Sequence, residues 1–366
     1  MSVSFQAYGN NSPSTELELI PSAPIDPALF LITSLTSTQL NTSITIGSKV
    51  YDFLYTGTID LSAAQGATPK NIAEASQYTV PNAITAFTIS NAGQALFTET
   101  FSPAIDFDRV GYLLDNGTKM VAELAGNDVY RSSTTATGNN NDTVYLYAGN
   151  DTYYVNHALL TKVDLFYGGD GVDTAVYSQK AANYTIASTN SVWNYVSQTS
   201  NLPGFSVTDK TKAINTLYVN QVERLKFTDT NIALDIGKDQ TAGSAYMLYK
   251  AAFNRTPDVG GLGFWISKMD TGMSYNTVAQ NFVNSDEFRT AYGGSNPSVN
   301  TLVTKLYNNV LTRAPDGGGL AFWQDKLTTG GWTTANVLGY FATSAENVAN
   351  VASLIANGIP YQESVG

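Results

Sequence analysis

The sequence predicts a multidomain protein of mixed α and β class. Three observations predict it: composition changes along the chain, aspartates recur at regular spacing in the middle, and a segment near the end is duplicated. We expect a strand-leaning N-terminal domain at residues 1–122, a parallel β-roll with following strands at 123–237, and an all-α duplicated domain at 238–366. The 366 residues suffice for two or three domains.

The N-terminal region, residues 1–122, is rich in Ser, Thr and Ala and sparsely charged, with Arg109 as its first arginine. Apolar and polar positions alternate along residues 43–62, which is typical of a strand, a turn and a second strand. We also expect strands at 83–91 and 95–101 and a short helix at 69–78.

The central region contains the stretch GGDGVDTAV at residues 168–176, which fits the calcium-binding nonapeptide G-G-x-G-x-D-x-U-x at every fixed position. Calcium prefers six to eight oxygen ligands in a flexible geometry. Glycines let the backbone curl so that carbonyl oxygens point inward, and Asp173 supplies carboxylate oxygens. Asp170 is an additional candidate ligand. The central domain is therefore predicted to be a calcium-binding parallel β-roll.

The spacing of other aspartates supports a coil of repeated turns. From Asp128 the steps to Asp142, Asp151, Asp164 and Asp173 are 14, 9, 13 and 9 residues. If each full turn has one bend at each edge, the turns are 23, 22 and 22 residues long. Asp128, Asp151 and Asp173 then stack on a first edge, and Asp142 and Asp164 on a second edge. Two residues after each aspartate lie the inward candidates Tyr130, Val144, Tyr153, Phe166 and Ala175.

The two edges differ in their glycines. Each first-edge turn has a glycine two residues before its aspartate, and we expect two calcium sites between these turns. On the second edge Lys162 stands where a bending glycine is needed, which weakens that site. The candidate ligand positions are Gly126, Asp128, Gly149, Asp151, Gly169, Asp170, Gly171 and Asp173 on the first edge, and Asn141, Asp142 and Asp164 on the second.

An alternative interpretation is that these segments are hairpin turns of Asn, Asp and Gly that hold no ion. Stacked carboxylates argue against it, because without a cation the aligned acids repel one another.

The central region resembles the repeats-in-toxin (RTX, hemolysin-type) calcium-binding region of type I-secreted bacterial proteins. The resemblance continues into the strand-rich segment at 216–237, where Val222, Glu223 and Arg224 belong to the matching positions. It implies calcium as the cofactor, the type I secretion apparatus as a partner, and an extracellular location at the bacterial surface. The ending, residues 346–366, resembles the terminal segment that this apparatus reads.

The C-terminal region carries a duplication that begins at Tyr249 and again at Tyr307. Both copies have the pattern R-x-P-D-x-x-G-L-x-F-W, which resembles a helical domain of unknown function found near the C-termini of the same secreted and surface-layer proteins. Asp258, Asp316, Ser285 and Ser344 are expected helix N-caps. We expect Trp265 and Trp323 in the core, and Arg255 and Arg313 paired with a carboxylate inside each copy.

Composition excludes several classes of protein. The net charge of −11 argues against nucleic-acid binding, and the absence of cysteine excludes disulfides and thiolate zinc sites. No N-terminal secretory signal and no transmembrane segment is visible. No catalytic serine or zinc motif is present, and the single histidine, His157, lies inside the predicted roll. We therefore expect no enzyme.

The first hypothesis is a secreted calcium-binding structural protein that self-assembles into a surface layer, matrix or filament. The sparsely charged N-terminal region, residues 1–122, is the expected assembly domain, because uncharged polar and aromatic groups cost less to bury between copies than charged groups do. The alternatives are a calcium-dependent adhesin whose N-terminal region binds surface glycan, and a secreted hydrolase. The acids that the hydrolase would use are Asp52, Asp60, Glu74, Glu99, Asp106 and Asp108.

Overall fold

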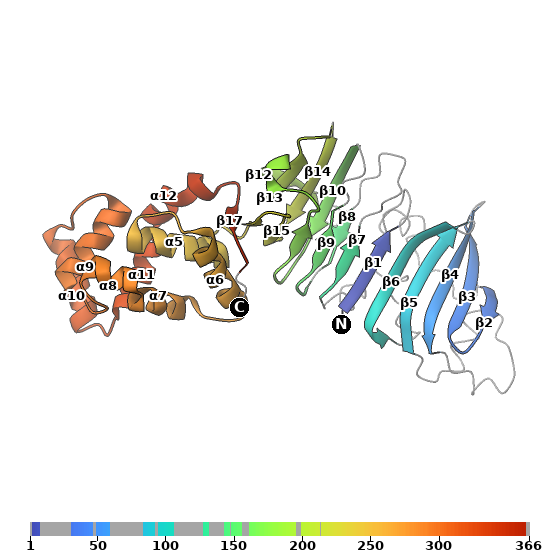
Figure 1. Ribbon diagram of the computed structural model, residues 1–366, viewed down its shortest axis with the longest axis horizontal. Helices are drawn as coiled ribbons and strands as arrows, with labels where there is room; N and C mark the ends of the chain where they lie inside the picture. Colours follow the sequence, from blue (N-terminus) through green and yellow to red (C-terminus); the bar gives the residue numbers. More distant parts are fainter. Residues whose placement is uncertain are drawn as a thin grey trace. The chain divides into compact units, whose positions relative to one another are not determined.

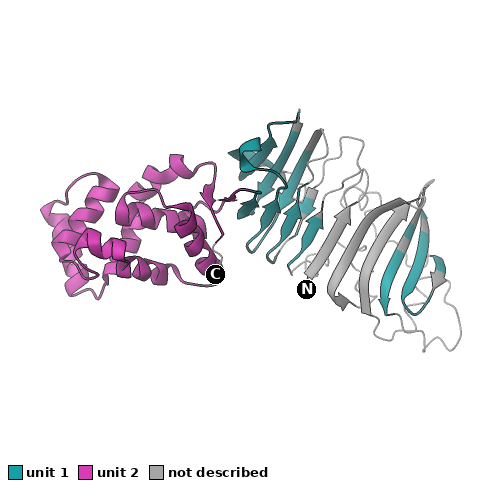
Figure 2. Ribbon diagram, viewed as in Figure 1, with its two compact units in different colours: residues 1–228 teal, residues 229–366 magenta. Residues whose placement is uncertain are grey.

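The computed structural model shows a chain of mixed α and β structure, rich in strands in its N-terminal part and helical in its C-terminal part (Figure 1). It divides into two compact units, residues 1–228 and 229–366 (Figure 2). The predicted junction at 122/123 lies outside the described residues. The structure describes residues 2–7, 31–46, 49–58, 83–91, 94–105, 127–131, 143–146, 148–155, 161–194, 199–212 and 214–363.

The first unit contains an antiparallel array of strands in the order β1, β6, β5, β4, β3, β2 (Figure 1). The strands predicted at 43–62, 83–91 and 95–101 are confirmed by β3 to β6, while the helix predicted at 69–78 lies outside the described residues. The bounds are β1 (Ser2–Ala7), β2 (Leu31–Leu35), β3 (Gln39–Ile46), β4 (Lys49–Thr58), β5 (Ala83–Asn91) and β6 (Gln94–Ile105).

The rest of the first unit is built from two parallel ladders between which the chain alternates. The first ladder runs β7, β9, β11, β15, and the second ladder runs β8, β10, β14. Successive first-ladder partners, such as Val129, Thr152 and Thr174, are 23 and 22 residues apart, as the aspartate spacing predicts. The bounds are β7 (Val129–Arg131), β8 (Thr143–Tyr145), β9 (Thr152–Tyr154), β10 (Thr161–Tyr167), β11 (Thr174–Val176), β14 (Ile214–Asn220) and β15 (Arg224–Lys226).

A hairpin interrupts this alternation after β11. A short 3₁₀ helix (Ala181–Asn183) leads into β12 (Tyr184–Asn194), which pairs antiparallel with β13 (Thr199–Asp209). β13 then pairs antiparallel with β14, so the hairpin extends the second ladder at one side. The next first-ladder strand, β15, therefore begins 50 residues after β11 rather than one regular turn later.

The side chains predicted to point inward do so. Tyr130, Val144, Tyr153, Phe166 and Ala175 are all buried. The rings of Tyr130 and Tyr153 stack with centroids 5.1 Å apart, and those of Tyr153 and Phe166 with centroids 5.3 Å apart. Residues of both ladders thus share one apolar interior, which fixes the register of the turns.

The second unit consists of eight described α-helices and a small antiparallel strand pair, β16 (Asn231–Ala233) with β17 (Ile359–Tyr361). A π-helical turn (Tyr307–Leu311) extends the fifth of these helices, α9. None of the described helices combines the length and the apolar character needed to cross a bilayer. The bounds are α5 (Thr241–Phe253), α6 (Val259–Asp270), α7 (Tyr275–Asn284), α8 (Asp286–Tyr292), α9 (Val299–Leu306), α10 (Gly317–Thr328), α11 (Thr334–Ala342) and α12 (Ala345–Ile355).

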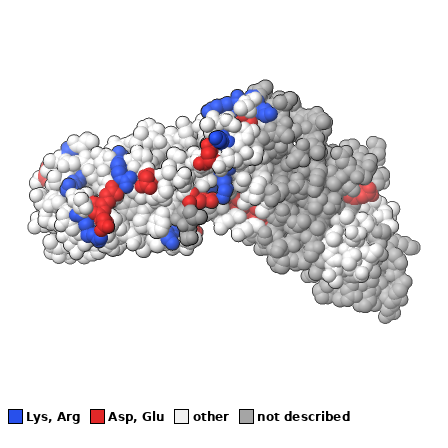
Figure 3. All heavy atoms as spheres, viewed as in Figure 1, with Lys and Arg blue, Asp and Glu red and all other residues white. Residues whose placement is uncertain are grey.

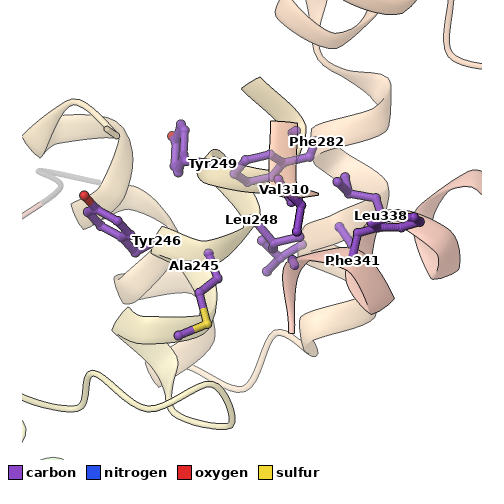
Figure 4. Packing of buried hydrophobic residues seen from close by; sticks show 14 of the residues in the cluster. Ala245, Tyr246, Leu248, Tyr249, Phe282, Val310, Leu338 and Phe341 are labelled. Carbon is purple, nitrogen blue, oxygen red and sulfur yellow. The ribbon is translucent and has the colours of Figure 1, made fainter. Parts of the chain in front are cut away.

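The helices surround one contiguous apolar core to which both copies of the duplicated segment contribute (Figure 4). Leu248 of α5, Phe282 of α7 and Leu338 of α11 lie in it, together with Phe341. Trp323 is buried as predicted, and Trp265 is partly buried against the same core. Apolar residues recurring at helical spacing explain why these segments form helices and pack on one another.

The duplicated positions have the expected capping roles. The carboxylates of Asp258 and Asp316 accept hydrogen bonds from the N–H groups of Gly261 and Gly319, at 2.6 and 2.7 Å. The hydroxyls of Ser285 and Ser344 likewise cap α8 and α12. Each cap satisfies one backbone N–H that the first helical turn leaves without a partner.

The predicted arginine pairing holds in one copy only. Arg255 makes two parallel contacts with Glu287, at 2.7 and 2.8 Å, and its guanidinium lies 4.9 Å from the Tyr249 ring centroid. Arg313 stacks on the Tyr307 ring at 5.1 Å but forms no ion pair with a described residue, so that prediction is wrong. The second copy has one more residue before its glutamate and the extra π-helical turn, which change the reach of the pair.

Candidate calcium-binding edge

The first-edge aspartates stand directly before three neighbouring strands of the first ladder. The backbone N–H of Asp128 donates to Oδ1 of Asp151 at 2.7 Å, and the N–H of Asp151 donates to Oδ1 of Asp173 at 2.8 Å. The three acids are therefore stacked in register on one edge, as the spacing predicts. We call the stack of Asp128, Asp151 and Asp173, together with Glu223, which continues it, the carboxylate ladder.

The glycines of these turns are required by backbone conformation and by space. Gly149, Gly169 and Gly171 have φ values of 135°, 108° and 141°, which residues with a side chain rarely adopt. A Cβ on Gly171 would lie 1.8 Å from the carbonyl oxygen of Gly149. A Cβ on Gly168 would lie 2.3 Å from Oδ2 of Asp173. Small turns thus bring backbone and carboxylate oxygens close together, while Gly126 lies outside the described residues.

The stacked carboxylates are removed from solvent. Asp128, Asp151 and Asp173 are 0%, 1% and 0% exposed. The Oδ2 atoms of Asp151 and Asp173 are buried and accept no hydrogen bond from any residue that the structure describes. A buried ionised carboxylate with an unsatisfied oxygen is costly unless a proton or a cation accompanies it.

The pKa values express this cost. Burial raises the pKa of the Asp151 carboxyl from 3.8 to about 7, although the hydrogen bond from the Asp128 backbone lowers it. Burial also raises the pKa of Asp173 to about 7, with smaller contributions from the negative charges of Asp151 and Asp170. Near neutral pH the carboxyl groups of Asp151 and Asp173 therefore bind protons readily, and a bound cation could take the place of those protons.

An asparagine stack runs beside the acids and was not singled out from the sequence. Oδ1 of Asn127 accepts the N–H of Asn150 at 2.7 Å, and Oδ1 of Asn150 accepts the N–H of Val172 at 2.9 Å. The repeated AGND at residues 125–128 and 148–151 was the available signal. Two side-chain bonds therefore tie each turn to the next and hold the carboxylate ladder in place.

A fourth member of the carboxylate ladder comes from the turn before β15. Oε2 of Glu223 accepts the N–H of Asp173 at 2.9 Å, and the carbonyl of Asp173 accepts the N–H of Arg224 at 2.9 Å. Gln221 has a φ of 50°, at the position where the preceding turns have glycine. Glu223 thus continues the stack of Asp128, Asp151 and Asp173 in register, 50 residues after Asp173.

The remaining predicted ligands are placed differently. Asp170 is exposed, and its carbonyl accepts the N–H of Gly149 at 2.8 Å. Asp164 is buried inside β10, where Oδ2 accepts the Tyr153 hydroxyl at 2.9 Å. The bend expected at Asp164 is therefore absent, because Lys162 and Val163 continue the strand where a glycine would turn it. Asn141, Asp142 and His157 lie outside the described residues.

Side chains alone do not complete a metal site on this edge. Within the described ranges, no group of three or more His, Cys, Asp or Glu side chains could hold a metal ion. Calcium also accepts backbone carbonyl oxygens, and the glycine turns bring such oxygens beside the aspartates. The Oδ2 atoms of Asp151 and Asp173 fit a hard cation, because they are oxygen donors that lack a partner.

Comparison with known proteins gives one match. A family described as Domain of unknown function (DUF4214) matches residues 279–351, which run from α7 into α12 and include the second copy of the duplicated motif. Neither a curated protein nor a solved structure matches the chain. The match agrees with the duplicated helical segment but assigns no activity to it.

Proposed function

We propose that the chain is an exported, calcium-binding structural protein of the RTX kind, which folds on binding calcium outside the bacterial cell and then self-assembles at the surface. The observation that carries the proposal is the pair of buried Oδ2 atoms of Asp151 and Asp173, which have no partner among the described residues. They belong to carboxylates stacked in register on glycine turns of two parallel ladders. In this proposal the two ladders are a calcium-binding β-roll.

Asp128, Asp151 and Asp173 would supply the carboxylate oxygens, and the turns at Gly149, Gly169 and Gly171 the carbonyl oxygens. Bound calcium supplies the positive charge that stacked, buried acids otherwise lack. Glu223, in register at the end of the stack, is a further candidate ligand, which the sequence indicates only as a position of the strand-rich segment at 216–237.

Calcium binding would couple folding to location. At low calcium the stacked acids repel one another and oppose the folded turns, which suits passage of an unfolded chain through the type I secretion apparatus. At millimolar calcium the binding free energy adds to the folding free energy, because only the folded turns bring the oxygens together. The proposal assigns no catalytic activity to the chain.

The partner in assembly is another copy of the same chain. On the described face of the second unit in Figure 3, charged side chains gather in a few patches and uncharged residues cover most of the rest. Uncharged polar surface costs less to remove from water than charged surface.

The experiment is refolding of the purified full chain with calcium, with an equal concentration of magnesium, and with chelator, followed by electron microscopy and light scattering. We expect ordered lattices or filaments with calcium alone. Magnesium is the matched control, since it keeps its water and demands a tighter geometry. A chain that folds equally well in chelator refutes the calcium part. A chain that folds with calcium and stays monomeric refutes the assembly part.

A further inference from the structure

A cleft of about 570 Å³ lies in the second unit, where the start of α7 meets the α10–α11 connection and α11 itself. Clefts that hold small ligands commonly measure about 300–1,000 Å³. Six of its lining residues have side chains with aromatic or hydrogen-bonding groups, and three are glycines that expose backbone. The six are Tyr275, Asn276, Trp332, Asn336, Tyr340 and Thr343.

The lining carries no Lys, Arg, Asp or Glu side chain. Lys326 lies outside the lining, with its Nζ 5.9 Å from the centroid of the Trp332 ring. Phosphates and carboxylates therefore find no ion-pair partner in the lining, and cations find no carboxylate. The chemistry favours a neutral molecule that has apolar faces and hydrogen-bonding edges.

The two aromatic rings differ in exposure, because Trp332 is partly buried against the helical core whereas Tyr340 lies at the surface. Tyr340 is 54% exposed, and its ring meets the Trp332 ring at 62° with centroids 6.0 Å apart. The buried Trp323 lies behind both rings, and its ring centroid is 6.0 Å from that of Trp332 and 5.2 Å from that of Tyr340. Rings that are supported from behind and open in front lose little freedom when a ligand stacks on them.

Hydrogen-bonding groups stand unused beside these rings. Oδ1 of Asn336 accepts both the N–H and the hydroxyl of Thr333, each at 2.9 Å, so its amide nitrogen remains available. Within the described part of the chain, the side chains of Asn276 and Tyr340 and the Trp332 indole N–H bond to no protein group. The Tyr275 hydroxyl, by contrast, is held by the Gly339 carbonyl at 3.2 Å.

The duplication shows that the fold does not require an aromatic ring at either of these two positions. Thr333 caps α11 as Ser274 caps α7, which aligns the two copies with a spacing of 59 residues. At this spacing Met273 stands opposite Trp332, and Asn281 stands opposite Tyr340. Met273 and Trp332 both pack, partly buried, against the helical core, so the copies share an apolar residue there. The first copy nevertheless forms the same helices without an aromatic ring at either position, so the shared packing does not require these two rings.

We propose that this cleft binds a neutral saccharide. A sugar ring has an apolar face of C–H groups that packs on Trp332 and Tyr340, and its edge hydroxyls meet the amides of Asn336 and Asn276. Exposed glycine backbone at Gly330 and Gly331 lets the ring approach closely. The site lies in the helical unit and uses none of the carboxylate-ladder residues, so a test of saccharide binding is independent of the calcium proposal.

The test titrates the full chain, at saturating calcium and again in chelator, with neutral hexasaccharides built from glucose, N-acetylglucosamine or mannose, using calorimetry and the indole N–H resonances. At least one hexasaccharide is expected to bind and shift the Trp332 resonance. The double variant Trp332→Met and Tyr340→Asn installs the first copy's residues and should weaken binding by about tenfold or more. Phe264→Ala, which removes an exposed aromatic ring of the first copy, should leave binding unchanged.

Circular dichroism of the double variant checks that the helices persist. The proposal is overturned if no hexasaccharide binds, if the double variant binds as well as the original chain, or if Phe264→Ala weakens binding equally. It is also overturned if the double variant loses self-association while its saccharide binding is unchanged, because the cleft is then a contact between copies.

Discussion

The two units use aspartate in opposite ways. In the helical unit, Asp258 and Asp316 accept a backbone N–H at a helix start and remain exposed, so water satisfies their other oxygen. In the carboxylate ladder, Asp151 and Asp173 also accept a backbone N–H, but their other oxygen is buried. The backbone and the solvent together satisfy an exposed capping carboxylate, whereas a buried acid of the carboxylate ladder requires a proton or a cation.

The two units also differ in how much apolar packing supports them. The helical unit has one contiguous core drawn from all its helices. First-ladder strands such as β9 and β11 are only three residues long, and their turns are built from Gly, Asn and Asp. Much of the stability of a helix comes from packing of its apolar face. We therefore expect the second unit to stay folded without a bound ion, and the two parallel ladders to need one.

Removing calcium should produce the largest difference between the units. Each occupied site adds about 2.7 kcal/mol when free calcium is about a hundred times the dissociation constant, so two sites stabilise the ladders by about 5 kcal/mol. Hydrogen exchange measured by mass spectrometry in chelator should rise strongly across residues 148–155 and 170–176. Exchange across α5 should change little. Equal protection of the ladder segments with and without calcium contradicts the account.

The pH dependence of the metal-free chain should be the next largest effect. The folded-state pKa values of Asp151 and Asp173 are raised to about 7, so the folded chain binds more protons than the unfolded chain between about pH 4 and 7. Stability of the metal-free ladders should therefore be greatest near pH 4 and fall as the pH rises to about 7. A shift of about 3 pH units corresponds to at most about 4 kcal/mol for each carboxylate.

Calcium should reverse this trend, because it displaces the same protons and binds more tightly as the pH rises toward 7. Denaturant titrations of the ladder segments at pH 5 and pH 8, with chelator and with calcium, measure both effects. Asp151→Asn should reduce the dependence of stability on pH in the metal-free chain, because it removes one of the two titrating carboxyl groups. Stability of the metal-free ladders that rises from pH 5 to pH 8 contradicts the raised pKa values.

Two glycines with similar backbone conformation allow a sharper comparison. Gly171 has a φ of 141° and Gly294 a φ of 133°, but only at Gly171 would a Cβ collide with backbone, the Gly149 carbonyl. Gly294→Ala should cost about 1–3 kcal/mol through backbone strain alone. Gly171→Ala should cost more and lower calcium affinity as well. The measurements are thermal unfolding and calcium titration of both variants, and equal costs argue against close contact between the turns.

The smallest effect is expected within the helical unit. Glu287→Gln removes the charge that pairs with Arg255 at a partly exposed site, where the two side chains are 44% and 36% exposed, and should cost less than about 1 kcal/mol. Glu346→Gln, the matching change in the second copy, should cost less still, because Arg313 makes no ion pair with a described residue. Denaturant midpoints of the two variants check this order, and a larger loss for Glu346→Gln would reverse it.

Local patterns in the sequence predict much of this fold. The helix caps at Asp258 and Ser285 and the strands at 83–91 follow from side-chain chemistry over a few residues. The 23- and 22-residue turns follow from aspartate spacing, because a repeated turn must return the same residue to the same edge. The first-edge stacking of Asp128, Asp151 and Asp173 was predictable for the same reason.

Features that depend on distant parts of the chain were not predictable. Glu223 joins the carboxylate ladder only because the hairpin of β12 and β13 is inserted between β11 and β15, which hides the regular spacing. Asp164 fits the spacing yet lies in a strand, since Lys162 cannot replace a bending glycine. The cleft residues Trp332 and Tyr340 gave no signal, because an aromatic residue in a helical pattern indicates core as readily as surface.

Calorimetric calcium titration of Asp151→Asn and Asp164→Asn tests the central claim most directly. Both substitutions keep an oxygen for the existing hydrogen bond, from Asp128 N–H in one case and the Tyr153 hydroxyl in the other. Asp151 is the middle acid of the first edge, so its variant should lose two calcium ions, whereas the Asp164 variant should bind as the original chain does. Equal calcium loss in both variants would contradict the assignment of calcium to the carboxylate ladder.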